Sequence, residues 1–151
     1  MRAAVAALLL ATACAAPPPG ALVPVTVPLR NPTAPIASQA DATLARLQGD
    51  WVVVQGAGMT SGTRIAVDGG ALRMAEVTLP LADSGRGRLT LGDQAVWVHW
   101  IDIDDRTAAL GAPDGSRVWI MDRTGNPGER LRAAREILDW YGYDLKRMEG
   151  P

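Results

Sequence analysis

The sequence predicts an antiparallel all-β domain, a barrel or a sandwich, with one helix packed on it near the C-terminus. Short apolar, β-branched segments alternate with turns along the middle of the chain, which is the pattern of all-β folds. The 16 Gly and 11 Pro among 151 residues favour a turn-rich chain over a helical bundle. Near the C-terminus the apolar period lengthens from two to that of a helix.

Composition also limits the class of partner. Charge is nearly balanced, with 15 Lys and Arg against 16 Asp and Glu, and the basic residues are scattered. A nucleic-acid-binding domain gathers its basic residues on one face, so we expect no nucleic-acid partner. No residue pattern points to a cofactor, and we expect none.

The N-terminus has the layout of a secretory signal. Arg2 precedes an apolar run over residues 3–13, which is too short to span a bilayer. Small residues then lead into Cys14, and this stretch resembles a bacterial lipobox, which implies lipidation of Cys14. Ordinary cleavage after Ala11-Thr12-Ala13 is the alternative, and it would leave a periplasmic protein with a free thiol. Ala15 after the cysteine favours the outer membrane.

The sequence therefore divides into three parts. Residues 1–13 are the expected signal peptide, residues 14–40 a lipidated tether, and residues 41–151 the folded domain. Seven of the 11 prolines lie between Pro17 and Pro35. Proline favours extended polyproline geometry, so residues 15–40 are expected to form a stiff, solvated spacer.

Each element of the domain has a local signal. Asp41 can cap a short helical turn that carries Leu44 and Leu47 on one side, and Gly49 ends it. Asp68-Gly69 is a strong hairpin signal between two strands. The expected strands are residues 51–56, 63–68, 71–81, 88–91, 94–104, 107–111 and 117–122.

The last element is an amphipathic helix. Asn126 is the expected N-cap, Pro127 occupies the first helical position, and Gly142 stops the helix. Apolar residues recur at helical spacing between these ends. The basic residues of this helix form a solvated face or contact an anionic membrane surface; they are Arg130, Arg132 and Arg135.

Three segments carry a resemblance to a known family: LQGDW, WIDIDDRTAALGAPDG and VWIMDRTGNPGERLRAAREILDWYGYDL. Over roughly residues 41–147 they resemble the bacterial lipocalins of the apolipoprotein-D-like branch. That family shows Gly-x-Trp at the first strand, a W-x-D-x-D-Y segment, a G-P-D turn and a W-I-L-x-R strand end. The resemblance implies an antiparallel up-and-down barrel with one C-terminal helix. Asp104-Asp105 departs from the Asp-Tyr of the family.

The resemblance also assigns the closed end of the barrel. In lipocalins the Trp of Gly-x-Trp plugs that end and an Arg after the last strand packs across it. Gly49, Trp51 and Arg123 match these positions, and a guanidinium over an indole is a cation–π contact. The span from Trp51 to Trp119 is short by about one hairpin. Either several strands are very short, or one pair is lost and the barrel is partly open.

Strand alternation gives the candidate ligand-binding residues. Asp102 and Asp104 are expected to face outward. Side chains alternate between the two faces of a strand, so the odd-numbered residues of this strand should face the interior. On the last strand, Arg123 is expected to turn toward Trp51 at the end of the barrel. The residues two and four positions before Arg123 lie on the same side of the strand and should therefore face inward. The interior candidates are Val53, Trp97, His99, Ile101, Trp119 and Met121.

The sequence does not support a catalytic triad, a metal site or a dinucleotide-binding loop. His99, the single histidine, could be oriented by Asp102 or Asp104, but no G-x-S-x-G elbow accompanies it. Asp102, Asp104 and Asp105 lack the glycine and glutamate of an EF-hand, so a strand end is expected rather than a metal site. Residues 56–62 are Gly-rich but precede a strand, which excludes a dinucleotide loop.

The predicted function is therefore binding rather than catalysis. We expect a lipid-anchored outer-membrane protein that faces the periplasm and holds a hydrophobic ligand in its barrel. The resemblance implies fatty acids or lysophospholipids as the ligand class. The alternative is a structural or interaction protein of the envelope whose shortened barrel is filled by its own side chains.

Overall fold

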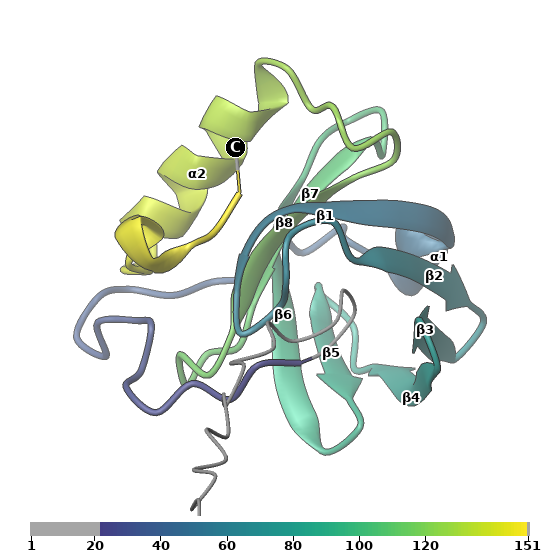
Figure 1. Cartoon of the computed structure of the whole chain (residues 1–151), viewed down its shortest axis with the longest axis horizontal. Coiled ribbons are helices and arrows are strands. Elements are labelled where there is room, and N and C mark those ends of the chain that lie inside the picture. Colours follow the sequence, from purple (N-terminus) through teal and green to yellow (C-terminus); the bar gives the residue numbers. More distant parts are fainter. Residues whose placement is uncertain (1–21, 151) are drawn as a thin grey trace, which may run out of the picture.

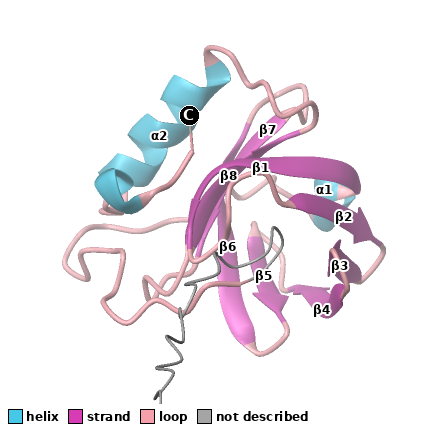
Figure 2. Ribbon diagram, in the orientation of Figure 1, coloured by secondary structure: helices cyan, strands magenta, loops and turns pink. Residues whose placement is uncertain are grey.

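Eight antiparallel strands form a closed barrel, and one long helix packs on its outside (Figures 1 and 2). The computed structural model describes residues 22–150. The strands are β1 (Gly49–Ala57), β2 (Arg64–Asp68), β3 (Ala71–Met74), β4 (Val77–Asp83), β5 (Arg88–Leu91), β6 (Gln94–Ile101), β7 (Thr107–Gly111) and β8 (Val118–Asp122). The helices are α1 (Leu44–Leu47), α2 (Arg130–Trp140) and the 3-10 turn η1 (Leu145–Arg147).

Each strand pairs with the next in sequence, and β1 closes the barrel against β8. The predicted up-and-down barrel with one C-terminal helix is confirmed. The direction of the strands gives the barrel two ends. We call the end that holds α1, Gly49 and Arg123 the floor, and the opposite end, with the connections 58–63, 75–76, 92–93 and 112–117, the rim.

The barrel has eight strands because one segment that is predicted to be a single strand forms two strands. Residues 71–81 were expected to be continuous, but a turn at Ala75 and Glu76 divides them into β3 and β4. Ala75 has a φ of +49°, the left-handed conformation that glycine usually supplies at such a turn. Of the two expected alternatives, very short strands are therefore the correct one.

Bulges interrupt two of the longer strands. The register of β1 against β8 shifts between Val53 and Gln55, and that of β6 against β7 shifts between Val98 and Trp100. A bulge adds one residue to a strand and inverts the alternation of faces beyond it. These two positions decide which side chains enter the barrel.

Two apolar cores lie on the two faces of the β1–β8 wall. The inner core fills the barrel from Leu47 at the floor to Met59 at the rim. The outer core lies beneath α2, which contributes Ala134 and Leu138, both fully buried. α2 contacts β6, β7 and β8, so the predicted amphipathic helix packs on this side of the barrel (Figure 1).

Both helices begin later than the sequence predicts. Asn126 is not the N-cap, because α2 starts at Arg130 with Glu129 before it. The N–H groups of Asn126 and Thr124 are instead bonded by the Asp122 carboxylate in a turn. Gly128 then has a φ of +60°, and α2 begins at Arg130. Asp41 is likewise not a cap, since α1 follows Thr43. Gly142 ends α2 as expected, with a φ of +83°.

The described part of the expected tether is not a solvated spacer. Residues 22–40 run along the barrel, and Leu29 is 2% exposed within the outer core. Arg30 forms a bridge with Tyr143, and Leu22 forms one with Met59 at the rim. Cys14 and the expected signal peptide lie outside the described residues. Within residues 22–150, no helix is long and apolar enough to cross a membrane.

The packing of α2 generates a direct prediction. Leu138→Ala should lower the free energy of unfolding by about 2–5 kcal/mol, because it leaves a cavity in a fully buried site. Trp140→Ala on the same helix should change it by less than about 0.5 kcal/mol, since Trp140 is 70% exposed. Urea unfolding measures both. Equal midpoints for the two variants would contradict this placement of α2.

Candidate functional site

The interior of the barrel is the candidate site, and it is almost filled. A cavity of about 10 Å³ remains, which is the space of one water molecule at most. Nine of the ten side chains around it are aliphatic or thioether groups, and the tenth is an indole. They are Leu47, Val67, Leu72, Leu81, Leu89, Leu91, Val96, Leu110, Trp119 and Met121.

Four of the six candidate ligand-binding residues lie in this interior. Trp119 and Met121 line the cavity, and Val53 and Ile101 belong to the same core. All four are at most 2% exposed. Their contact with a ligand remains a prediction.

Trp97 and His99 do not face the interior, which corrects the prediction for both. Val96 and Val98 occupy the inner face of β6 before the bulge, and Ile101 occupies it afterwards. Trp97 lies on the outer face with the Arg88 guanidinium 4.5 Å from its ring centroid. His99 is the extra residue of the bulge, and the sequence carries no signal for it, because apolar residues stand on both sides.

The floor is closed by Arg123, as the resemblance implies. Its guanidinium carbon lies 3.6 Å from the centroid of the Trp51 ring, and Trp51 is 1% exposed. The guanidinium donates to the carbonyls of Gln48 at 2.6 Å, Asp105 at 2.9 Å and Arg46 at 3.0 Å. One side chain thus joins the end of β8 to the start of β1, to α1 and to the β6–β7 turn.

Gly49 is needed for this closure. Its φ is +95°, and a Cβ at this position would lie 3.1 Å from Nη1 of Arg123. A side chain would therefore strain the backbone and press on the guanidinium. This contact explains why Gly precedes Trp51 by two residues.

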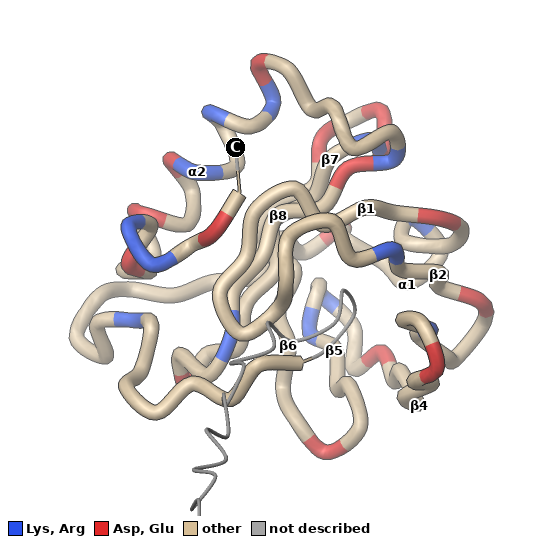
Figure 3. Tube along the Cα trace, in the orientation of Figure 1, with Lys and Arg blue, Asp and Glu red and all other residues tan. Residues whose placement is uncertain are grey.

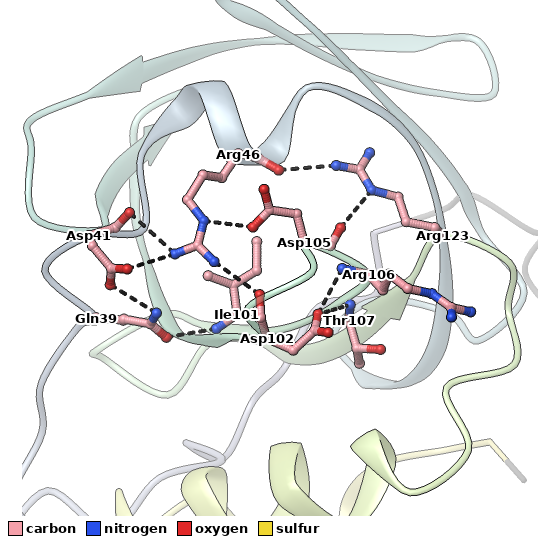
Figure 4. Close-up of polar contacts among 9 residues, drawn as sticks. All are labelled: Gln39, Asp41, Arg46, Ile101, Asp102, Asp105, Arg106, Thr107 and Arg123. Carbon is pink, nitrogen blue, oxygen red and sulfur yellow. Dashed lines mark hydrogen bonds and ion pairs between the residues drawn. The ribbon is translucent and has the colours of Figure 1, made fainter.

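A second arginine forms an outer layer of polar contacts on the floor (Figure 4). Arg46 of α1 donates through Nε to Asp105 at 2.6 Å, through Nη1 to Asp41 at 2.9 Å, and through Nη2 to the carbonyl of Asp102 at 2.9 Å. Gln39 extends the network by donating to Asp41 and accepting from the N–H of Ile101. Asp105, which departs from the family pattern, is therefore the ion-pair partner of Arg46.

The aspartates after β6 act as structural groups. Burial raises the pKa of Asp102, but the Thr107 N–H, the Arg130 guanidinium and the Arg106 N–H outweigh it and leave the pKa below its ordinary value. Arg130 pairs with Asp102 at 2.7 Å and with Asp104 at 3.1 Å. No group of three or more acidic, His or Cys residues within 22–150 is arranged to hold a metal.

The basic face of α2 is mixed with acidic residues, as Figure 3 shows. Arg130 is committed to Asp102 and Asp104, and Arg135 donates to Gln55 of β1. Arg132 lies 3.8 Å from Glu136 and is exposed. Two of the three arginines therefore tie the helix to the barrel, whichever surface Arg132 meets.

The two buried indoles differ in one respect. The Trp51 N–H donates to the Leu47 carbonyl at 2.7 Å. The Trp119 N–H has no hydrogen-bond partner among the described residues, although Trp119 is 0% exposed. A buried donor without a partner lowers the free energy of unfolding by about 1–3 kcal/mol, so this N–H destabilises the core.

The barrel wall is least covered at β4. β4 pairs with β5 over Leu81 to Asp83, while its upper half pairs with β3. Val77 is directly opposite Met74 and so shares its inward face, yet Val77 is 42% exposed. The rim is consequently open to solvent at the top of β4.

His99 joins the barrel to the segments outside it. Its Nδ1 lies 2.7 Å from the Ala37 carbonyl, and its Nε2 lies 2.9 Å from the Tyr143 hydroxyl. Tyr143 Oη also lies 2.9 Å from the Ala112 carbonyl, so its one proton has two acceptors within reach. Burial is the main cause that lowers the pKa of His99 to about 4; the hydrogen bond to Ala37 opposes the shift and the nearby Arg30 charge adds to it. These partners are not those of a Ser-His-Asp triad.

No protein-family model and no curated protein matches the sequence. Among solved structures, the chain is similar to the major allergen Per a 4 from cockroaches, with a TM-score of 0.54 and 13% sequence identity. The similarity covers 79% of this chain and 94% of the allergen. At this identity it shows the fold alone, a lipocalin-like barrel.

The floor generates a prediction about stability. Arg123→Ala should lower the free energy of unfolding by about 2–4 kcal/mol, because it removes both the stacking and the carbonyl bonds. Arg123→Lys should recover less than half, since an ammonium lacks the planar fork. Arg88→Ala is the matched control, an exposed arginine over Trp97 that should cost about 1 kcal/mol at most. Full recovery with Lys would contradict the stacking.

The His99 contacts generate a pH prediction. The folded-state pKa of about 4 lies below the ordinary 6.5, so the unfolded chain binds the proton more readily. The stabilisation is complete above pH 6.5 and is lost as the pH falls toward about 4, by roughly 2–3 kcal/mol. His99→Gln should flatten this dependence, while the carboxylates titrate alike in both proteins. The same slope in both proteins between pH 7 and 4.5 would exclude His99 as its source.

Proposed function

We propose that this protein is an envelope lipoprotein that binds a small hydrophobic molecule inside its barrel. The observation that carries the proposal is the interior itself, a closed eight-stranded barrel with an apolar lining and a sealed floor. Ligand sites in proteins are mostly apolar cups with few polar groups, and burial of apolar area is what holds the ligand. The resemblance to lipocalins gives fatty acids or lysophospholipids as the expected class.

Binding requires the interior to open from its present volume of about 10 Å³. The side chains that must move include Leu89, Leu91 and Met121, and an unbranched Met adapts to irregular spaces readily. The uncovered top of β4 is the natural entrance, because β4 has few register pairs with β5. The free energy of opening reduces the apparent affinity for any ligand.

The filled interior also favours a second function. A barrel packed at the density of a protein core is a rigid platform that acts through its surface. A shallow hollow of about 550 Å³ lies along α2, and its lining combines Leu131 and Leu145 with charged residues of the helix. In this alternative the protein binds another component of the envelope and no ligand.

A fluorescence titration separates the two functions. The probe is N-phenyl-1-naphthylamine, an uncharged apolar fluorophore. The native chain is compared with the double variant Leu72→Ala/Leu89→Ala, which enlarges the interior. Ligand binding predicts a saturable 1:1 signal with the native chain, retained by the outer-face control Trp97→Ala. No signal with the native chain, but a 1:1 signal with the enlarged interior, would establish the filled platform and overturn the proposed function.

The location is the other half of the proposal. The lipobox-like stretch before Cys14 supports a lipid-anchored protein on the periplasmic side of the outer membrane, and two or three acyl chains would hold it firmly. Mass spectrometry of the mature protein from a Gram-negative host should find Cys14 first, with a diacylglyceryl group. Cys14→Ala should lose the lipid. A mature chain that begins at an unmodified Cys14 would contradict the anchor.

A further inference from the structure

We infer that the short stretch of chain between the anchor and the barrel keeps the rim against the membrane, so that the mouth of the barrel faces the phospholipid leaflet. This inference rests on the proposed function, because it takes the lipid anchor at Cys14 as given and names the surface that the anchored protein meets. It starts from the place where the described chain begins. Leu22 forms a bridge with Met59 at the rim, and the Val23 N–H donates to the Gly58 carbonyl at 3.4 Å (Figure 1, purple).

Residues 22–30 are fixed along this end of the barrel. Leu22 packs against the inner core. The Leu29 N–H donates to the Gly115 carbonyl of the rim at 2.7 Å, and the Leu29 carbonyl accepts the Asp144 N–H at 2.7 Å. Leu29 is also buried in the outer core. These contacts determine the point at which the chain leaves the barrel toward the anchor.

The length of chain between this point and the anchor is short. Seven residues, 15–21, separate Cys14 from Leu22. A fully extended chain spans ~3.3–3.6 Å per residue, so the distance from Cys14 to Leu22 is about 29 Å at most, whatever the conformation. A free spacer over residues 14–40 would reach about 80 Å at ~3.1 Å per residue. The docking of residues 22–40 therefore places the barrel close to the membrane.

The same limit favours one end of the barrel over the other. Strands rise ~3.3 Å per residue and tilt by roughly 40° in a barrel, so the eight residues of β6 give a wall roughly 20 Å high. If the floor faced the membrane, the chain from Leu22 would first have to run back along this wall, which uses most of its reach. If the rim faces the membrane, none of the reach is used in this way.

Charge does not account for this orientation. The exposed turns of the rim carry Glu76, Asp93 and Asp114, which an anionic leaflet would repel. Val23 and Val77 lie at the same end of the barrel and are 38% and 42% exposed. The anchor and these apolar side chains hold the rim at the bilayer, so the orientation should not change with salt concentration.

The orientation places the uncovered top of β4 on the membrane side. Fatty acids and lysophospholipids, the expected ligand class, dissolve in the leaflet. A ligand can therefore move between leaflet and barrel over a short path, with little exposure of its hydrocarbon to water. The leaflet that holds the anchor is then the source or the destination of the ligand.

Fluorescence quenching tests the inference with the full mature, lipidated chain in phosphatidylcholine vesicles that contain a lipid with a nitroxide on its headgroup. Cys14 is the only cysteine and its sulfur carries the lipid, so one introduced cysteine takes the fluorophore. Asp93→Cys labels the rim, and Ile103→Cys, 92% exposed in the β6–β7 turn, is the matched label at the floor. Because the labels lie roughly 20 Å apart along the barrel, the rim label should lose about three times as much fluorescence as the floor label. Glu76→Cys, in a second exposed turn of the rim, should repeat the rim value.

A lengthened chain is the control for the cause. An insertion of about 20 Gly and Ser residues before Leu22 raises the reach to roughly 100 Å. The ratio of rim quenching to floor quenching should then fall to about one. A ratio that stays at about three would show that chain length is not the cause and would overturn the inference.

The other outcomes separate the two levels of the proposal. A mature chain without lipid on Cys14, detected by mass spectrometry, would overturn the anchor and this inference together. A lipidated chain whose floor label is quenched as strongly as its rim label would overturn the inference and leave the anchor intact. The same conclusion would follow if neither label were quenched, since the barrel would then lie away from the membrane.

Discussion

The Arg123 guanidinium over the Trp51 ring is the contact on which closure of this barrel depends. Its N–H groups reach main-chain carbonyls of α1, of the residue before β1 and of the β6–β7 turn, so that three segments distant in sequence (residues 46–48, the β6–β7 turn and the end of β8) meet at one side chain. The planar fork of arginine suits this geometry, since it can stack and donate in its own plane at once. Arg46 and Asp105 then form an outer layer of the same floor. With this end sealed, any exchange of the interior with solvent must occur at the rim.

The short strands set the second constraint. β3 and β5 have only four residues each, which makes the wall low on that side, and the side chains of the eight strands nearly fill the space that they enclose. The resulting core is apolar and dense, except that it leaves one indole N–H of Trp119 without a partner. Because the interior is filled and β4 is uncovered at the rim, a ligand would have to displace side chains of the lining to enter.

Much of the fold could be predicted from sequence because its signals are local. Asp68-Gly69 marks a hairpin, Gly142 ends α2, and the Gly49, Trp51 and Arg123 pattern gives the floor with its stacking contact. The turn at Ala75 was missed because a left-handed alanine has no compositional signature. The inward set on β6 was wrong for Trp97 and His99 because a bulge adds one residue without changing the hydrophobic pattern. The docking of residues 22–40 was missed because it depends on long-range partners such as Tyr143 and Met59.

The central claim is that the apolar interior of the barrel is a ligand site. A crystal structure of the protein grown with methyl decanoate tests it most directly. We predict electron density for the ester inside the barrel, with the leucines of β3 to β5 displaced. An interior that stays filled, with the ester absent or bound only on the outer surface, would contradict it.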